Sequence, residues 1–252
     1  MSAVFQDHFS GLARRYADFR PRYPGALFDY LATRATRDQL VWDCACGSGQ
    51  ATIDLAARFE KIIATDGSAQ QIASAPRCDN VEYRVALADQ SGLEDGSIGL
   101  VTIAQALHWF NDKDFFAEVE RVLKPGGTLA AWVYGTSQIE GDGMDAIVQD
   151  YYTKVVRPYW PPEWRFIEGR YRAIRLPFPE IRTPSFRMEE LWRLDQLLGY
   201  FSSWSATTRF VEATGRDPIE PLRHNLAMVW REPERARRVV WPLTVRVAVK
   251  PR

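Results

Sequence analysis

The stretch VWDCACGSGQ, at residues 41–50, carries the clearest structural signal in this chain of 252 residues. It starts as a short apolar run, reaches an acid at Asp43, and continues into a loop of small residues that includes Gly47 and Gly49. The next residues, 51–59, place apolar side chains at helical spacing, which predicts a helix. A strand, a glycine turn and a helix N-terminus together form a cradle for a nucleotide-like ligand, because small residues let backbone N–H groups approach it closely.

A second apolar run, KIIATD at residues 61–66, also ends in an acid, Asp66. In nucleotide-binding sheets, an acid at the tip of the second strand is placed to hold a ribose diol. Asp66 is therefore a candidate ribose contact.

Strands and helices alternate along the first half of the chain. Apolar or alternating runs predict strands at residues 81–85, 98–104 and 128–134, and helical spacing predicts a helix over residues 112–123. This alternation predicts a doubly wound α/β fold, in which a mostly parallel sheet has helices on both faces. Residues 243–249 alternate apolar and polar side chains, a half-exposed pattern typical of an antiparallel edge strand.

The segment between Gly135 and Trp241 differs from the rest in composition. Six of the nine tryptophans lie at or after Trp160, which opens a proline-rich run at residues 160–164. Helical spacing also predicts a helix whose apolar positions are Leu191, Leu194, Leu198 and Phe201. We interpret this segment as helical insertions over the carboxyl ends of the strands, where ligands bind in open α/β sheets.

The chain is electrically balanced, with 32 Lys and Arg residues against 32 Asp and Glu residues. A formal net charge of zero argues against broad attachment to nucleic acid or to an anionic membrane. The sequence shows no signal-like apolar region and no uninterrupted apolar run of about 18 residues. We therefore expect a soluble, cytoplasmic protein.

Three cysteines, Cys44, Cys46 and Cys78, are accompanied by only three histidines. Two of the cysteines lie inside the small-residue loop, where they are best explained as small side chains packed beneath it. We expect no metal site.

A dinucleotide-binding fold is one interpretation of the loop at residues 43–49. Its fingerprint needs a third small residue three positions after the second glycine, where this chain has Thr52. Asp43 would also repel a pyrophosphate, whereas a carboxylate suits a ligand that carries an ammonium group. The residues therefore favour a zwitterionic, sulfonium-bearing nucleoside. An NAD(P)-dependent oxidoreductase on a related fold and a non-catalytic cofactor-binding relative remain as alternatives.

The loop DCACGSG at residues 43–49 resembles the acid-x-G-x-G-x-G loop of class I S-adenosylmethionine-dependent methyltransferases. Asp66 matches the ribose-binding acid of that family, and Asp89 matches its adenine-binding acid. Residues 121–129, RVLKPGGTL, resemble its recurring passage from helix to strand. Four such motifs in the right order make the resemblance specific.

Three flanking motifs are similar to a small-molecule branch that includes trans-aconitate methyltransferase-like proteins (methyltransferase type 11). They are RPRYP at residues 20–24, QALHWF at residues 105–110 and YFSSWS at residues 200–205. This resemblance covers most of the chain without naming a substrate.

The resemblance implies a Rossmann-like, doubly wound, seven-stranded sheet that is mostly parallel, with an antiparallel C-terminal edge strand and a helical insertion over the active site. We expect a single domain over residues 1–252. Its core would comprise residues 36–135, 179–190 and 240–252, and its helical cap would comprise residues 136–178 and 191–239.

Two residues depart from the family pattern. Ala45 replaces the first glycine of the loop, which is tolerable if its φ angle is negative. Gly99 replaces an acid that usually precedes the fourth strand, and we expect this to cost local stability rather than activity.

The resemblance implies S-adenosyl-L-methionine as cofactor and S-adenosyl-L-homocysteine as product. Asp43 is expected near the cofactor's amino group, and Arg20 with Tyr16 near its carboxylate. The full expected cofactor-binding set is Tyr16, Arg20, Asp43, Ala45, Gly47, Gly49, Asp66, Gly67, Ala88, Asp89 and Gln105.

The expected reaction is in-line methyl transfer to a small molecule, at a carboxylate or hydroxyl oxygen. His108 is the candidate general base, since its unperturbed pKa lies near working pH; the alternatives are a local hydrogen bond or an acceptor that needs no base. The candidate substrate-binding residues, which in the alternative only pack, are Trp109, Trp160, Trp164 and Trp204. We expect a monomer or homodimer with no nucleic-acid or membrane partner, and neutral charge disfavours methylation of RNA or protein.

Overall fold

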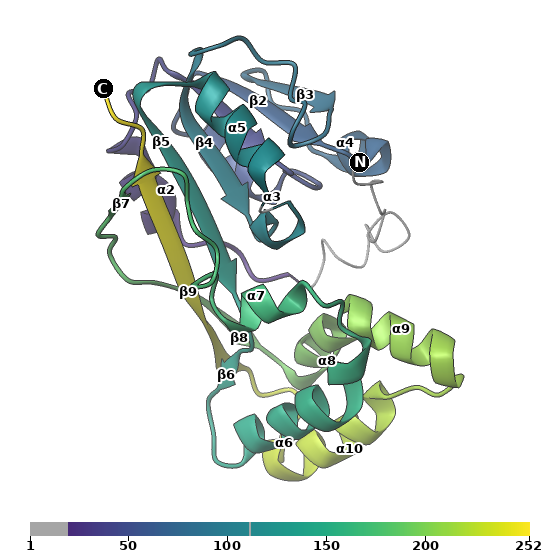
Figure 1. Cartoon of the computed structure of the whole chain (residues 1–252). Coiled ribbons are helices and arrows are strands. Elements are labelled where there is room, and N and C mark those ends of the chain that lie inside the picture. Colours follow the sequence, from purple (N-terminus) through teal and green to yellow (C-terminus); the bar gives the residue numbers. More distant parts are fainter. Residues whose placement is uncertain (1–19, 111) are drawn as a thin grey trace.

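The computed structural model describes residues 20–110 and 112–252. Its sheet has the strand order β3-β2-β1-β4-β5-β9-β6, and every pairing from β3 to β5 is parallel (Figure 1). These parallel strands are β1 (Leu40–Cys44), β2 (Lys61–Asp66), β3 (Val81–Val85), β4 (Ile98–Ala104) and β5 (Leu123–Tyr134). The central strands read as continuous apolar runs because helices cover both of their faces, whereas β3 carries charged residues because it is an edge strand.

Strand β9 (Arg237–Val249) runs antiparallel to β5, which confirms the predicted direction of the C-terminal strand. It is longer than the predicted residues 243–249, and both of its edges are paired. β5 and the two-residue β6 (Gln138–Ile139) pair with one edge, and β7 (Glu180–Ile181) and β8 (Phe186–Trp192) pair with the other. The described residues thus form a nine-stranded sheet rather than the seven-stranded one expected, because the insertion supplies short strands of its own.

Helices cover the two faces of the parallel block, as the doubly wound fold requires. Alternate residues of one strand point to opposite faces, so Val41 packs in one apolar cluster and Trp42 in the other. Helices α2 and α3 belong to the cluster of Val41, and α5 belongs to that of Trp42. The helices around the block are α2 (Gly25–Ala32), α3 (Gln50–Ala56), α4 (Ala69–Ser74) and α5 (Lys113–Val122).

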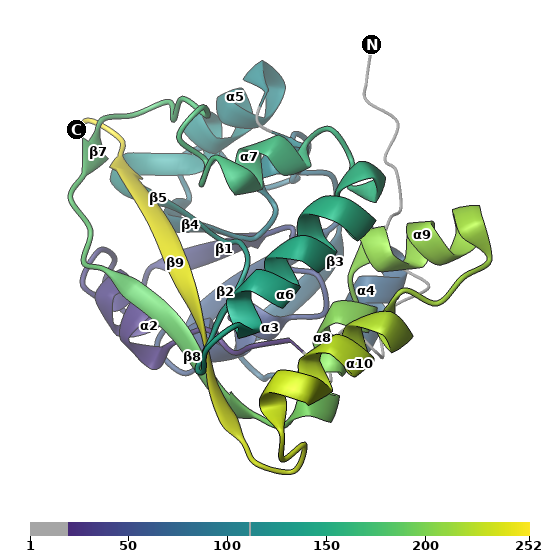
Figure 2. The same cartoon turned by 90° about the horizontal axis from the view of Figure 1, so that it is seen from below.

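The insertion places its helices beyond the carboxyl ends of β4 and β5 (Figures 1 and 2). Its aromatic interior is continuous with the cluster on the α2 and α3 face. Trp241 of β9 anchors it, since its indole N–H donates to the Tyr200 hydroxyl at 3.2 Å and its ring meets Trp192 edge-on. The elements of the insertion are α6 (Met144–Asp150), the π-helical η3 (Tyr151–Val156), the 3₁₀ turn η4 (Arg157–Tyr159), α7 (Trp164–Glu168), α8 (Leu194–Ser202), α9 (Ser205–Thr214) and α10 (Ile219–Trp230).

Gly99 has a steric reason for being glycine. A Cβ atom there would lie 2.6 Å from Oε1 and 2.8 Å from Cβ of Gln39. Gln39 thus occupies the space that the acidic side chain of the family pattern would need.

No helix within residues 20–110 and 112–252 has the length and apolar character that crossing a membrane requires.

Candidate functional site

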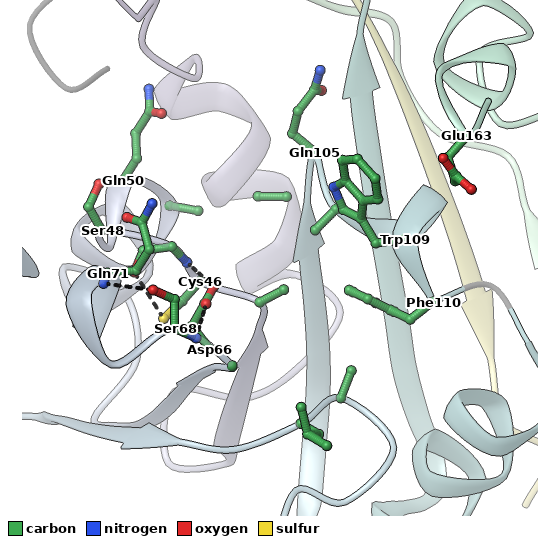
Figure 3. Close-up of a pocket in the computed structure, with 18 of the residues that line it drawn as sticks. Cys46, Ser48, Gln50, Asp66, Ser68, Gln71, Gln105, Trp109, Phe110 and Glu163 are labelled. Atoms are coloured by element: carbon green, nitrogen blue, oxygen red, sulfur yellow. Dashed lines mark hydrogen bonds between the residues drawn. The ribbon is translucent and has the colours of Figure 1, made fainter. Parts of the chain in front are cut away.

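A cavity of about 820 Å³ lies at the carboxyl ends of the parallel strands, between the core and the insertion (Figure 3). Its core side is formed by the loop after β1, the end of β2 and the loop after β3. Its other side is formed by the segment after β4, the end of β5 and a few residues of the insertion. This volume is typical of sites for small ligands and cofactors.

The loop after β1 turns through two glycines with positive φ angles. Gly47 has a φ of 56° and lines the cavity, whereas Gly49 has a φ of 83° and begins α3. A Cβ atom on Gly49 would lie 2.9 Å from the Tyr83 hydroxyl and 3.2 Å from Cδ of Pro76. The absence of a side chain at Gly49 therefore lets the loop pack closely against Tyr83 and Pro76. Gly49 is not part of the cavity wall.

Ala45 also lines the cavity, but its φ of 54° does not meet the condition under which an alanine is tolerated there without strain, a negative φ. A left-handed conformation is unfavourable for an L residue because Cβ crowds the following carbonyl oxygen. The loop therefore keeps the backbone shape of the family glycine at the cost of local strain.

Asp66 joins the loop to the end of β2 (Figure 3). Its Oδ2 accepts a hydrogen bond from the backbone N–H of Gly47 at 2.9 Å, and its Oδ1 accepts one from Ser68 at 2.9 Å. A carboxylate has about four acceptor positions, so it can accept several hydrogen bonds at once. Asp66 and the adjacent Gly67 both line the cavity, and both belong to the expected cofactor-binding set.

Ala88 and Asp89 line the far end of the core side, in the loop after β3. Glu118 of α5 holds this loop, because its carboxylate accepts from both the N–H and the hydroxyl of Ser91. Arg121 pairs with the same carboxylate. Sequence reasoning missed Glu118, although a charged residue between the apolar positions of an amphipathic helix was the available signal.

Asp43 lies beneath the loop, fully buried and outside the cavity lining. Its two carboxylate oxygens accept from the hydroxyls of Thr52, at 2.6 Å, and Thr102, at 2.8 Å. Burial raises the pKa of Asp43 to about 6. Asp43 is expected near the cofactor's amino group, and this placement leaves the loop between Asp43 and the cavity. It also explains Thr52, whose hydroxyl satisfies the buried acid.

Gln105 lines the cavity with its side chain tied to β5. Its amide donates to the carbonyl of Tyr134 and accepts from the N–H of the same residue, both at 2.9 Å. Its backbone is left-handed, with a φ of 55°. The strained backbone and the double hydrogen bond fix the start of the segment that follows β4.

Arg20 lies at a small pocket next to the main cavity and outside its lining. Its guanidinium donates to the Tyr134 hydroxyl at 3.0 Å and lies 5.8 Å from the centre of the Tyr200 ring. Tyr16 lies outside the described residues.

His108, the candidate general base, lies behind the wall of the cavity rather than in its lining. It is 3% exposed, and its Nδ1 is 3.0 Å from the Tyr171 hydroxyl. Burial lowers its pKa to about 3. A general base must reach the proton that it abstracts from a bound acceptor, so this placement does not favour the expected role.

Of the four tryptophans predicted to bind substrate, Trp109 alone lines the cavity. Trp160 and Trp164 stack on each other with ring centroids 3.5 Å apart, and Trp204 lies 5.6 Å from Trp160. These three rings pack on one another outside the cavity lining, and Trp164 and Trp204 line the small neighbouring pocket beside Arg20. The insertion instead lines the cavity with residues that sequence reasoning missed, which are Pro161, Pro162, Glu163 and Arg209.

The part of the chain that the structure describes holds no group of three or more His, Cys, Asp or Glu side chains arranged to bind a metal ion.

Comparisons with known proteins agree on one activity. A family model described as a methyltransferase domain matches residues 42–131. A Dictyostelium discoideum protein, assigned as a methyltransferase without a stated substrate, is 33% identical over 230 residues, which span 90% of this chain and 88% of that protein. A Saccharomyces cerevisiae protein, named as an S-adenosylmethionine-dependent methyltransferase, is 30% identical over 129 residues, 47% of this chain and 44% of its own length.

A solved structure from Anaeromyxobacter dehalogenans, assigned as a type II methyltransferase, is 41% identical to this chain. It superposes with a TM-score of 0.86 over 93% of this chain and 100% of its own. The names of these three proteins state no substrate, so the resemblance to the trans-aconitate branch stays a prediction.

Proposed function

We propose that this chain, which belongs to the class I S-adenosylmethionine-dependent methyltransferases, transfers a methyl group to an oxygen atom of a small molecule. The observation that carries the proposal is the composition of the cavity. One side has the glycine loop with Asp66 and Asp89, as a cofactor site requires. The other has largely aromatic and proline walls that also carry Arg209, Asp112 and Glu163. S-adenosylmethionine supplies an electrophilic methyl group when it is bound, and the chain must hold an acceptor in line with it.

The core side of the cavity fits the cofactor. The loop from Ala45 to Gln50 would line the methionine portion, Asp66 would accept from the ribose hydroxyls, and Asp89 with Ala88 would meet the adenine. Asp43 and Gly49 support this site from beneath. Gln105 would contact the cofactor between its methionine and adenosine portions. Arg20 and Tyr16 are proposed to bind the carboxylate of the cofactor.

The opposite side of the cavity fits a small acceptor. Trp109, Phe110 and Tyr134 supply aromatic walls, and the insertion adds two prolines. These walls would exclude water from the reacting atoms, so that positioning supplies most of the catalysis. We place Trp160, Trp164 and Trp204 behind the prolines, where they support the wall without touching the acceptor.

Arg209 supports oxygen as the methylated atom, although Asp112 and Glu163 place two carboxylates on the same side of the cavity. Among the described residues that line the cavity, Arg209 is the only Lys or Arg, and no histidine is present. A guanidinium pairs well with an anionic group such as a carboxylate. An oxygen that is already ionised attacks without a general base, so neither His108 nor a substitute for it is needed.

We also propose that residues 1–252 form one domain with the core and cap boundaries expected from the sequence. Two features support this: β9 pairs with β5 of the core and with β6 of the cap, and the apolar cluster of the cap is continuous with that of one sheet face.

The first test is calorimetric titration with S-adenosylhomocysteine and, separately, with NADH. We expect binding of S-adenosylhomocysteine alone, and binding of NADH alone would overturn the proposal in favour of an oxidoreductase. The second test supplies S-adenosylmethionine with a labelled methyl group to small carboxylic acids, phenols and amines. We expect label on oxygen, and label on amines alone would overturn the choice of atom.

Arg209→Gln tests the acceptor half separately. We expect the KM for acidic acceptors to rise roughly 10- to 100-fold, since a charge-assisted hydrogen bond is lost, while S-adenosylhomocysteine affinity is unchanged. The matched control is Arg223→Gln on α10, an exposed arginine that pairs with Glu220 away from the cavity.

A further inference from the structure

Tyr171 of the insertion meets the wall of the cavity from behind. Its side chain is fully buried, and its hydroxyl lies 3.0 Å from Nδ1 of His108 in the 3₁₀ turn η2 (Leu107–Trp109). Burial raises the pKa of the Tyr171 phenol, and hydrogen bonding from the backbone of His108 and Leu107 opposes that rise. The phenol thus faces η2, a turn whose N-cap residue, Ala106, provides no side-chain cap.

The backbone is strained at the point where it places the Tyr171 side chain against η2. Arg170 and Tyr171 are consecutive L residues with φ angles of 52° and 58°, in the left-handed region that disfavours a side chain. Arg246 of β9 holds the turn, because its Nη1 donates to the carbonyls of Tyr171, at 2.5 Å, and Ile174, at 2.6 Å. Glu180 of β7 pairs with the same guanidinium. Strain that the surrounding structure enforces at one point is a reason to look for a role there.

The turn η2 is also part of the cavity wall. Trp109, its last residue, and Phe110, which follows it, both line the cavity. The rings of His108 and Trp109 have centroids 4.7 Å apart, so a change at His108 reaches Trp109 directly. The segment from residue 105 to residue 110 is therefore held at its start by the hydrogen bonds of Gln105 to β5, and at its turn by Tyr171.

We propose that Tyr171 and His108 are positioning residues that set the acceptor wall of the cavity. The Tyr171 hydroxyl donates its proton to Nδ1 of a neutral His108. This fixes the imidazole, and through it the angle at which Trp109 faces the acceptor. The link to catalysis rests on the proposed function, since it is the acceptor that Trp109 would meet. The structural link between Tyr171 and the cavity wall does not depend on the proposed function.

The first experiment needs no substrate. Tyr171→Phe removes the hydroxyl and keeps the ring, and amide hydrogen exchange then reports on residues 105–110. The matched control is Tyr151→Phe, because the Tyr151 hydroxyl is equally enclosed in the insertion and bonds to Thr207 at 2.8 Å, away from the wall. We expect protection of residues 107–110 to fall about tenfold in Tyr171→Phe, and to change no more than the rest of the chain in Tyr151→Phe.

Unchanged local protection in Tyr171→Phe, or an equal loss in both variants, overturns the proposal. Calorimetry with S-adenosylhomocysteine on the same samples separates this inference from the proposed function. We expect affinities within about twofold of the parent in both variants. A parent chain that fails to bind S-adenosylhomocysteine counts against the proposed function, while the exchange result still decides the positioning role.

The second experiment uses an acceptor that the labelled-methyl screen identifies. His108→Asn keeps an acceptor atom near the position of Nδ1, whereas His108→Ala removes it. We expect His108→Ala to lower kcat/KM about tenfold with cofactor affinity unchanged, and His108→Asn to recover most of the loss. We also expect the pH–rate profile to keep its shape in His108→Asn. Loss of a limb of that profile would show that His108 titrates in turnover as a base, and the positioning role would then be wrong.

Discussion

The backbone N–H of Gly47 and the carboxylate of Asp66 are joined by a hydrogen bond of 2.9 Å, which ties the loop after β1 to the end of β2. The bond uses one carboxylate oxygen, and Ser68 uses the other. Asp66 is thus both a candidate ligand contact and a brace for the loop that forms the rest of the cofactor site.

Asp66→Ala should weaken S-adenosylhomocysteine binding roughly 100-fold, because it removes a ligand contact and releases the loop together. Asp66→Asn should lose less affinity for S-adenosylhomocysteine, since one acceptor oxygen remains. Calorimetric titration checks both, with Asp79→Ala as the control at an exposed acid outside the cavity. An unchanged affinity in Asp66→Ala would remove Asp66 from the cofactor site.

Ala45→Gly should raise the free energy of unfolding by about 0.5–1 kcal/mol, because relief of the left-handed strain exceeds the extra entropy of glycine in the unfolded chain. Urea unfolding measures the change. Ala73→Gly, at an exposed position inside α4, is the matched control and should lower stability by about 0.5–1 kcal/mol. A loss of stability in Ala45→Gly would mean that the loop is not strained at this position.

Asp43 should make the folded chain less stable as the pH rises. Its pKa is raised from an ordinary value of 3.8 to about 6, so between those values the folded state holds a proton that the unfolded state releases. The stabilising contribution is therefore full below about pH 4 and is lost as pH rises through about 6, a change of roughly 2–3 kcal/mol. Asp43→Asn should lack this dependence. Urea unfolding at pH 4 to 8 compares the two, and parallel curves would contradict the prediction.

His108 should make the folded chain less stable as the pH falls. Burial lowers the pKa of His108 from 6.5 to about 3. Below about pH 6.5 the unfolded state therefore binds a proton that the folded state does not bind. The folded chain should therefore lose roughly 3 kcal/mol between pH 7 and pH 4 through this residue alone. His108→Asn should be less sensitive to acid than the parent. The same pH series checks this, and equal acid sensitivity would show that His108 titrates normally in the folded state.

The sequence predicts the parallel block well, because its signals are local. Each strand from β1 to β5 is an apolar or alternating run, and the acids at strand ends, Asp66 and Asp89, lie at the cavity as expected. The antiparallel direction of the C-terminal strand also follows from its alternation.

The sequence-based predictions that differ from the structure do so because of contacts between residues distant in sequence. Leu191 shares the helical spacing of Leu194 and Leu198, but it belongs to β8 and is 69% exposed, because pairing with β9 extends the strand to Trp192. His108 has the chemistry of a base, but Tyr171, 63 residues later, takes its Nδ1. No local pattern carries that partnership.

Strand β9 follows every strand with which it pairs. During synthesis, the helices of the insertion and the strands β5 to β8 leave the ribosome before the segment Arg237–Val249 that joins them. The parallel block can form from local βαβ units earlier, because each of its crossovers is already complete. The pairings that join the insertion to the sheet through β9 therefore have to wait until this strand has been synthesised.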